Sequence, residues 1–561
     1  MPEAEDLRSL PFRPETVFIA GGHSGSKKLL RECLEREVPC IVLGGRWAQR
    51  MRPSLLREAR TRKVRIIGPG SQGILFPEIW PACRGNSAVF AEGGDLLRAA
   101  AAEAFRRSVP FRYCLSFGES WDYSPLEAAR LILEQDAQVV LFAFVLRDIL
   151  RGRDLLDFAS LAAREGKRTA VLSLSRHGPA SRVEEAVFRQ YGIAVLEEPF
   201  QLVDAAAAFA AFGRPRRFSC SLSSGSRELG DLLSALAERE FPSLPAGGSE
   251  DEMLAIHSAE EGDTREKLES TAGRWTREGR TCLFTAAGGS PELEERTGAA
   301  ALPFVAGFRR CLKAVSLLDS SDISSEAPGA GPAHAPSRRR TLPPCPTEYD
   351  AKTLLRAYGI PIAREKLCHS LGEARRAAEI IGFPVALKVM SPNIVNKTEA
   401  RVIALNLQDA EELRNAYGRT LEKARLADPG GAIRGVLVQE MIRGGLEWRM
   451  EFRLDARFGP VVETGISGVY REILPDGVLR AAPFSVEEAM KMIRESRGCP
   501  LLLEGWRRDR LDMESLAAAL AAFSRLAAAE RGIGRLEVNP LFVNVSGVLV
   551  VDAFIKKKRG R

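Results

Sequence analysis

Short apolar runs alternate with longer amphipathic stretches through the first 318 residues of the chain. This alternation of strand-like and helix-like segments favours parallel α/β layers over antiparallel sheets. Three such layers separate along the chain, at residues 1–84, 85–213 and 214–318. Their predicted strands are TVFIAGG, CIVLGG and VRIIGPG in the first layer, SAVFAEGG, YCLSFGES, QVVLFAFV, RTAVLSLS and IAVLEEP in the second, and FSCSLSSG, TCLFTAAGG and LPFVAGF in the third.

The regular pattern stops at residues 319–346. From Ser320 to Pro346 the chain reads SSDISSEAPGAGPAHAPSRRRTLPPCP, so that Pro, Gly, Ser, Ala and a basic run replace the periodic apolar spacing. This composition predicts a flexible linker. A further domain is then expected over residues 347–561.

The overall composition is that of a multidomain globular protein. The chain has 561 residues, of which 45% are hydrophobic and 27% are charged, which predicts about three to five domains at ~100–200 residues each. The net charge of +7 is small for this length and does not favour nucleic acid as a partner. No signal-peptide pattern and no apolar run of ~18 residues is found, so we expect a cytoplasmic protein without a membrane segment. The ten cysteines never form a CxxC pair, which favours reduced thiols over metal or disulfide use.

The most informative chemistry lies in the last domain. Lys388 follows the apolar residues of a predicted buried strand, VALKVM, where an ammonium group can reach a phosphate oxygen. Glu537, Asn539 and Asp552 lie on two apolar runs separated by a turn, and a hairpin would bring their oxygens together as Mg²⁺ requires. The alternative is that the Asn-Pro pair only makes a turn and that Asp552 caps one.

Three blocks of this domain, in order, resemble a known family. The blocks VALKVMSPNIVNKTEARVIALNL, VLVQEM and LEVNPLFV with VVDA resemble the ATP-grasp domain of the ADP-forming acyl-CoA synthetases, relatives of succinyl-CoA synthetase. The resemblance implies an ATP site in which Lys388 contacts phosphate and the hinge residues Glu440, Met441 and Ile442 bind adenine. It also draws Glu447, two residues after a Gly-Gly turn, into the nucleotide site.

The first three layers resemble the remaining domains of the same family more loosely. IIGPGSQGILFPE resembles the signature that closes its CoA-binding Rossmann domain, although only the second half of that domain is recognisable. The second and third layers resemble its two flavodoxin-like ligase domains. The predicted fold is therefore α/β and multidomain, with a truncated Rossmann-like CoA-binding domain, two flavodoxin-like domains and a C-terminal ATP-grasp domain.

The phosphate-handling parts depart from the family pattern. Asn396 stands where the family has the histidine that relays a phosphoryl group, and Ala400 and Arg401 stand where it has glycines. Arg401 either contacts phosphate in place of backbone amides or is a surface residue. In the second layer, Glu92 and Asp95 occupy the turn that cradles the family's phosphohistidine, where carboxylates would repel a phosphoryl group.

Only five histidines are available for a phosphohistidine mechanism, and His177 is the candidate. It lies in a His-Gly pair after the predicted strand AVLSLS, eleven residues before Phe188, in a loop shorter than the family's. Either His177 still accepts phosphate or it is an ordinary loop residue. His23, His257 and His369 are poorer candidates, and His334 lies in the linker.

The resemblance implies the reaction acid + CoA + ATP giving acyl-CoA + ADP + phosphate. ATP and Mg²⁺ are the predicted cofactors, CoA and a small carboxylic acid are further candidate ligands, and a homo- or hetero-oligomer is implied. Because asparagine cannot form a stable phosphoramidate, Asn396 indicates reduced or altered activity. The alternative hypotheses are a non-catalytic nucleotide- or acyl-CoA-sensing scaffold that pairs with an intact paralogue, and direct phosphorylation of His177 by ATP.

Overall fold

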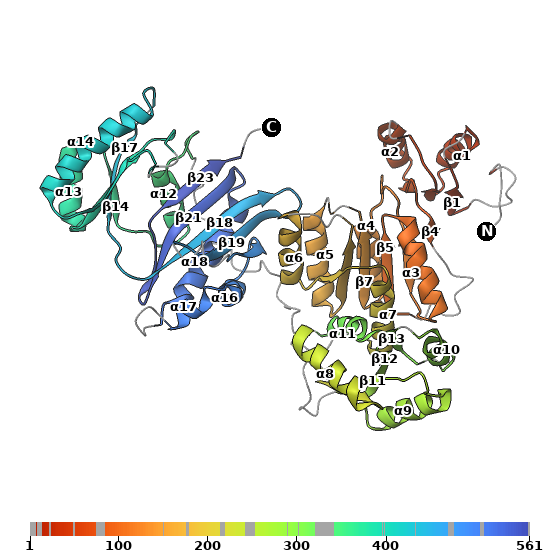
Figure 1. Cartoon of the computed structure of the whole chain (residues 1–561). Coiled ribbons are helices and arrows are strands. Elements are labelled where there is room, and N and C mark those ends of the chain that lie inside the picture. Colours follow the sequence, from red (N-terminus) through yellow and green to blue (C-terminus); the bar gives the residue numbers. More distant parts are fainter. Residues whose placement is uncertain are drawn as a thin grey trace. The chain divides into compact units, whose positions relative to one another are not determined.

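The structure is a computed structural model that divides the chain into two compact units (Figure 1). Unit 1 comprises residues 1–181 and 191–325, and unit 2 comprises residues 182–190 and 326–561. The described residues are 7, 14–21, 24–48, 51–74, 85–147, 149, 151–174, 179–213, 219–241, 253–288, 290–300, 302–319, 342–394, 397, 399–431, 433–468, 476–504 and 510–558. Within these residues, no helix is long and apolar enough to cross a bilayer.

Unit 1 begins with a small parallel sheet of three strands in the order β1-β2-β3. Ile41 and Ile66 are fully buried on adjacent strands, and Cys33 and Leu34 on the first helix pack into the same core. The elements are β1 (Thr16–Ile19), α1 (Ser24–Glu35), β2 (Cys40–Leu43), α2 (Arg52–Thr61) and β3 (Arg65–Ile67).

A six-stranded sheet follows, in the order β4-β6-β5-β7-β8-β9. All of its pairs are parallel except β4 with β6, and the order of β5 to β9 is that of flavodoxin-like folds. The elements are β4 (Gly73–Ile74), β5 (Ser87–Ala91), α3 (Gly94–Arg106), β6 (Tyr113–Ser116), α4 (Pro125–Gln135), β7 (Leu141–Leu146), α5 (Gly152–Arg164), β8 (Arg168–Ser173), β9 (Ala194–Leu196) and α7 (Phe200–Phe212). Helix α6 (Pro179–Gln190) follows β8, and its residues from 182 onward group with unit 2.

Side-chain alternation on β5 and β7 gives this sheet two different faces. Phe90, Phe142 and Phe144 stack on one face and meet the ring of Phe158 on α5 edge to face. The intervening small and branched residues, such as Val89, face the core formed with α3 and α7. Both faces are therefore covered, which explains why these strands read as continuous apolar runs.

A four-stranded parallel sheet completes unit 1, in the order β10-β11-β12-β13. Its elements are β10 (Ser219–Ser224), α8 (Arg227–Glu240), β11 (Met253–Ser258), α9 (Arg265–Arg277), β12 (Thr281–Ala286), α10 (Pro291–Ala299), β13 (Phe304–Ala306) and α11 (Phe308–Ser316). The strand β11 was not predicted, because His257 and Ser258 interrupt its short apolar run. His257, one of the poorer candidates for phosphorylation, is on this strand and shares a hydrogen bond with the Ser223 hydroxyl at 2.9 Å.

Unit 2 contains a smaller antiparallel sheet in the order β14-β17-β15-β16. Helices α13 and α14 lie side by side and share a hydrophobic core with this sheet (Figure 1). The elements are α12 (Glu348–Ala357), β14 (Glu365–Cys368), α13 (Leu371–Ile381), β15 (Val385–Met390), β16 (Ile403–Leu407), α14 (Ala410–Ala427) and β17 (Gly435–Glu440).

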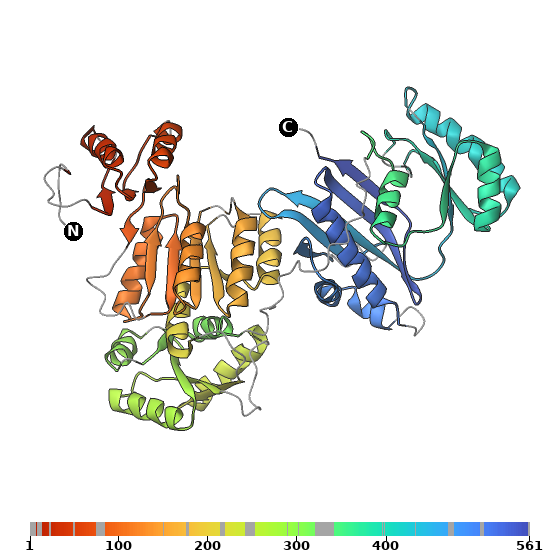
Figure 2. The same ribbon diagram turned by 180° about the vertical axis from the view of Figure 1, so that it is seen from behind.

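The second sheet of unit 2 is antiparallel, in the order β20-β19-β18-β21-β22, with β23 also paired to β21. Helix α18 packs on this sheet beside α16, as Figure 2 shows from behind. The elements are β18 (Leu446–Asp455), β19 (Gly459–Ile466), β20 (Val478–Ala481), α16 (Val486–Glu495), α17 (Cys499–Glu504), α18 (Met513–Ala529), β21 (Ile533–Asn544), β22 (Gly547–Val550) and β23 (Ala553–Lys557). The hairpin predicted from the spacing of Asn539 and Asp552 is formed by β21 and β22.

A buried ion cluster in unit 1 generates a test of stability. Asp204 accepts hydrogen bonds from Arg107 and Arg310, each at 2.7 Å, and its side chain is 2% exposed. We expect Asp204→Ala to destabilise unit 1 by about 3–5 kcal/mol, because it leaves buried guanidinium charge uncompensated. The measurement is calorimetric unfolding of the full chain. Asp95→Ala, which removes a 96% exposed carboxylate, is the control and should change stability little; equal effects would contradict the account.

Candidate functional site

Lys388 lies in the middle of the smaller sheet of unit 2. It pairs with Leu437 of β17 and Ile403 of β16, and it is 4% exposed. A buried ammonium group needs partners, because its desolvation is otherwise very unfavourable. The Lys388 Nζ atom donates to Glu348 Oε1 at 2.9 Å and to the carbonyl oxygen of Val551 at 3.0 Å.

Glu348 is the centre of a buried cluster of charges. It opens α12, where the Thr347 hydroxyl and the Asp350 carboxylate form a capping box. Its Oε1 lies 2.6 Å from Lys352 Nζ as well as 2.9 Å from Lys388 Nζ, and its Oε2 lies 2.9 Å from Lys397 Nζ. Three ammonium groups therefore converge on one fully buried carboxylate.

A second carboxylate, that of Glu365, extends this cluster. Lys352 Nζ lies 2.5 Å from Glu365 Oε2 and 3.1 Å from the Val551 carbonyl oxygen. Gln439 Nε2 donates to the same two acceptors, at 3.1 and 3.0 Å. Gln439 Oε1 is buried without a hydrogen-bond partner among the described residues. This amide oxygen, at the edge of the cluster, can therefore accept a hydrogen bond from another group.

The cluster shifts the pKa values of its members in different directions. Burial would raise the pKa of Glu348, but Lys388, Lys352 and Lys397 together hold it well below its ordinary value. Burial would lower the pKa of Lys388, but Glu348 and Asp552 raise it above its ordinary value. Burial, with Glu348 adding to it, raises the pKa of Asp552. The cluster thus favours charged Lys388 and Glu348, and it disfavours ionisation of Asp552.

Two cavities meet at Asp552. Cavity A has a volume of about 570 Å³ and an apolar wall formed by Ile403, Leu405, Met441, Ile442 and Phe542. Its polar wall contains Lys388, Arg401, Lys423, Gln439, Glu440 and Asp552. An apolar slot next to several cations suits a flat aromatic group joined to an anion.

The hinge that borders cavity A is tied to β14. Glu440 Oε2 pairs with Arg364 Nε at 2.6 Å, and Glu440 Oε1 accepts the Arg364 backbone N–H at 2.6 Å. The backbone N–H of Met441 points to the carbonyl oxygen of Pro384 at a longer distance, 3.3 Å. The Glu440 carboxylate is therefore committed to Arg364, whereas the Met441 amide is only weakly engaged.

Cavity B has a volume of about 550 Å³ and shares Asp552 with cavity A. Its polar wall contains Glu348, Lys397, Arg535, Glu537, Asn539 and Asp552, and its apolar wall contains Met390, Ile394, Phe554 and Ile555. Because Glu348 and Lys397 line cavity B while Lys388 lines cavity A, the charge cluster forms the wall between the two cavities.

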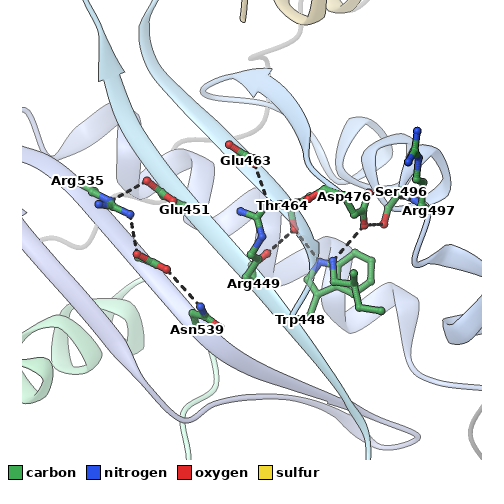
Figure 3. A network of polar contacts seen from close by, with 12 residues as sticks. Trp448, Arg449, Glu451, Glu463, Thr464, Asp476, Ser496, Arg497, Arg535 and Asn539 are labelled. Atoms are coloured by element: carbon green, nitrogen blue, oxygen red, sulfur yellow. Dashed lines mark hydrogen bonds and ion pairs between the residues drawn. The ribbon is translucent and has the colours of Figure 1, made fainter. Parts of the chain in front are cut away.

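The predicted metal ligands Glu537, Asn539 and Asp552 all line cavity B. Arg535 lies between two facing carboxylates (Figure 3): its Nε is 2.8 Å from Glu451 and its NH2 is 2.9 Å from Glu537. Glu537 Oε1 also accepts weakly from Asn539 Nδ2, at 3.4 Å. Glu537 is therefore held by Arg535, which leaves Asn539 and Asp552 as the better oxygen donors.

Asn539 is oriented from the end of β19. Ser467 donates to Asn539 Oδ1, and the neighbouring residue Ile466 is anchored through its backbone N–H to Asp476 at 3.2 Å. Asp476 also accepts hydrogen bonds from Ser496 and Arg497 (Figure 3). An amide oxygen held in this way can join one carboxylate in binding Mg²⁺, which commonly takes one or two protein carboxylates and keeps several waters. In the part of the chain that is described, no cluster of three His, Cys, Asp or Glu side chains could hold a metal by itself.

The structure thus brings most of the predicted nucleotide-site residues together. Lys388, Glu440, Met441 and Ile442 line cavity A, whereas Glu447 lies on β18 and lines neither cavity. His177, Asn396 and His23 lie outside the described residues.

Sequence reasoning missed Glu348, Lys352 and Lys397. Glu348 and Lys352 are spaced i, i+4 at the start of a helix, which is the ordinary pattern of an exposed helical ion pair. The pairing of Thr347 with Asp350 marked the helix start, but it gave no sign that the next residue would be buried.

This site lies in a part of the chain that is similar to known proteins. Residues 337–556 match the family model of the ATP-grasp domain. Over 211 residues the chain is 38% identical to the acetate–CoA ligase [ADP-forming] II subunit beta of Pyrococcus furiosus, a match covering 37% of this chain and 89% of that subunit. The chain belongs to the ADP-forming acyl-CoA synthetase family.

Other members of this family show the same extent of similarity. The acetate–CoA ligase [ADP-forming] I subunit beta of Pyrococcus furiosus is 33% identical over 206 residues, covering 37% of this chain and 89% of that subunit. A solved structure of the dinucleotide-forming acetyl-coenzyme A synthetase 1 of Ca. Korarchaeum cryptofilum, in complex with coenzyme A, Ca-AMPCP and HgCl⁺, is 34% identical with a TM-score of 0.37. It covers 38% of this chain and 93% of that chain. Membership in the acyl-CoA synthetase family, and the predicted α/β multidomain fold with an ATP-grasp domain, are confirmed.

Arg401, where the family pattern has glycine, gives a test at cavity A. Its φ of +51° is in the left-handed region, which costs a residue with a Cβ roughly 1–2 kcal/mol. We expect Arg401→Gly to be about 1 kcal/mol more stable than Arg401→Ala in chemical denaturation. If the guanidinium contacts phosphate, both variants should lose ATP affinity equally relative to wild type. Equal stability of the two variants would contradict the strained backbone.

Proposed function

We propose that unit 2 binds Mg-ATP across cavities A and B, within an acyl-CoA synthetase that converts acid, CoA and ATP to acyl-CoA, ADP and phosphate. The observation that carries this proposal is the meeting of the two cavities at Asp552, beside the ammonium group of Lys388. This arrangement lies in the part of the chain that matches the synthetase subunits.

Cavity A suits the nucleoside. Met441, Ile442 and Phe542 offer an apolar surface to a purine ring, and the Gln439 amide oxygen is an open acceptor for an amino group or a ribose hydroxyl. In this arrangement the triphosphate extends from the hinge toward Lys388. The cationic side chains of Arg401 and Lys423 on the same wall add to the attraction.

The phosphate end lies at the junction of the cavities. Asn539 and Asp552 are the residues that would hold Mg²⁺ between them and the phosphates, and Ser467 orients Asn539. When bound, the metal supplies charge neutralisation on the phosphate oxygens. Burial and Glu348 raise the pKa of Asp552, and a cation bound to this carboxyl group would favour its ionised form.

The rest of the proposed reaction belongs to unit 1. The sheet β1-β2-β3 is the proposed CoA-binding part, the sheets β4–β9 and β10–β13 are the proposed ligase domains, and His177 is the proposed phosphoryl acceptor. Two relatives with similar sequences are named as subunits, so we propose an assembly of more than one chain.

Asn396 supports a second candidate function. An amide cannot carry a phosphoryl group as imidazole does, so a relay through this position is chemically unavailable. A chain that retains a nucleotide cavity without this relay fits a nucleotide- or acyl-CoA-sensing scaffold that pairs with an intact paralogue.

Turnover assays separate these functions. Purified full-length chain is incubated with Mg-ATP, CoA and a panel of short carboxylic acids, and ADP release is followed together with transfer of label from γ-labelled ATP. We expect ADP release that requires both acid and CoA, and at least a roughly tenfold loss in Asp552→Ala, equivalent to about 1.4 kcal/mol. Glu514→Gln, an exposed carboxylate on α18, is the matched control.

The labelling result assigns the role of His177. Acid-labile label that disappears in His177→Ala identifies it as the phosphoryl acceptor. ATP binding with neither label nor ADP release would contradict the synthetase proposal and would favour the nucleotide- or acyl-CoA-sensing scaffold.

A further inference from the structure

Glu348 occupies an unusual place between the two cavities. Its side chain is fully buried, yet Lys388 and Lys397, which it binds through different oxygens, line cavities A and B respectively. The carboxylate thus joins a lysine on a central strand to a lysine 9 residues later in the chain.

The three lysines depend on Glu348 to different degrees. Lys352 also has Glu365 and the Val551 carbonyl oxygen as partners, and Lys388 also has the Val551 carbonyl oxygen. For the Lys397 ammonium, Glu348 is the partner found within the described residues, and the Lys397 side chain is 12% exposed. Lys397 is therefore the ammonium group that can most easily exchange Glu348 for another anion.

Charge makes such an exchange favourable. Lys388 and Lys397 flank the junction where the proposed phosphates lie, and a phosphate oxygen binds an ammonium group with the same charge-assisted geometry as a carboxylate. The Glu348 charge attracts the same ammonium groups and repels phosphate at close range. The terminal phosphate of a nucleoside triphosphate lies two phosphate groups farther from the nucleoside than that of a monophosphate, so contact with both lysines at the junction favours the triphosphate.

We propose that Glu348 is the resident counter-ion of the phosphate site, a positioning residue that holds Lys388 and Lys397 together and competes with the terminal phosphate of the nucleotide for them. The inference rests on the proposed function, since it requires ATP to bind at this junction. It assigns nucleoside triphosphates as the preferred ligand class, because only their terminal phosphate displaces Glu348 from Lys397.

Binding measurements on Glu348→Gln test this inference. The glutamine amide keeps an oxygen acceptor for Lys352 and Lys388 but removes the competing charge. We expect ATP to bind about tenfold more tightly to Glu348→Gln than to wild type in calorimetric titration, and AMP to bind equally to both. Glu514→Gln, which changes an exposed carboxylate on α18 that lines neither cavity, is the matched control, and we expect less than about a twofold change.

A second variant, Lys397→Met, and its combination with Glu348→Gln test the same inference without relying on Glu348→Gln alone. Lys397→Met should weaken ATP binding about tenfold, and Glu348→Gln combined with Lys397→Met should return the affinity to within about threefold of wild type. Circular dichroism confirms that each variant is folded. Unchanged ATP affinity in Lys397→Met, or equal weakening of ATP and AMP in Glu348→Gln, would overturn the inference.

Failure of the counter-ion role can be distinguished from failure of the proposed function. If wild type binds ATP and Asp552→Ala does not, but Glu348→Gln behaves as wild type, only the counter-ion role fails. If wild type binds no ATP, the proposed function fails and the counter-ion role fails with it.

Discussion

A carboxylate surrounded by three ammonium groups is stable in a protein interior only when all four groups are held together, since each alone would be very unfavourable to bury. In unit 2 this constraint links parts of the chain that are distant in sequence. Glu348 on α12 binds Lys388 on β15 and Lys397, and the Val551 carbonyl oxygen after β22 accepts from Lys352 and Lys388. The same contacts place Asp552 at the junction of the two cavities.

This constraint also explains how the lysines are held in place without a ligand and can still bind an anion. Glu348 keeps the lysines in place without a ligand. Burial raises the pKa of Asp552 and of Glu365, which disfavours full negative charge on the carboxylates around these lysines. The wall between the cavities is thereby suited to phosphate. In the lining of cavity B, Arg535 bridges Glu451 and Glu537, and Ser467 orients Asn539.

Much of this site could be predicted from the sequence, because it depends on local patterns. Lys388 follows from an apolar strand, and the hairpin that carries Asn539 and Asp552 follows from two apolar runs with a turn between them. The bridge that Arg535 makes between Glu537 and Glu451 could not be predicted, because Glu451 lies beside these two residues only in the observed register of β18 against β21. The buried position of Glu348 could not be predicted either, because tertiary packing decides whether the start of a helix is buried. In unit 1, the alternation of strands and helices predicted the parallel sheets but missed β11, whose run is short and polar at its end.

Lys388, Lys397 and Asp552 can act on one nucleotide only when ATP lies across the junction of the two cavities. The most direct test is a crystal structure of the full chain with Mg²⁺ and a non-hydrolysable ATP analogue. We expect the adenine against Met441 and Ile442 in cavity A, the terminal phosphate between Lys388 and Lys397, and the metal on Asp552. A nucleotide bound elsewhere, or a terminal phosphate that leaves the Glu348–Lys397 ion pair intact, would contradict this expectation.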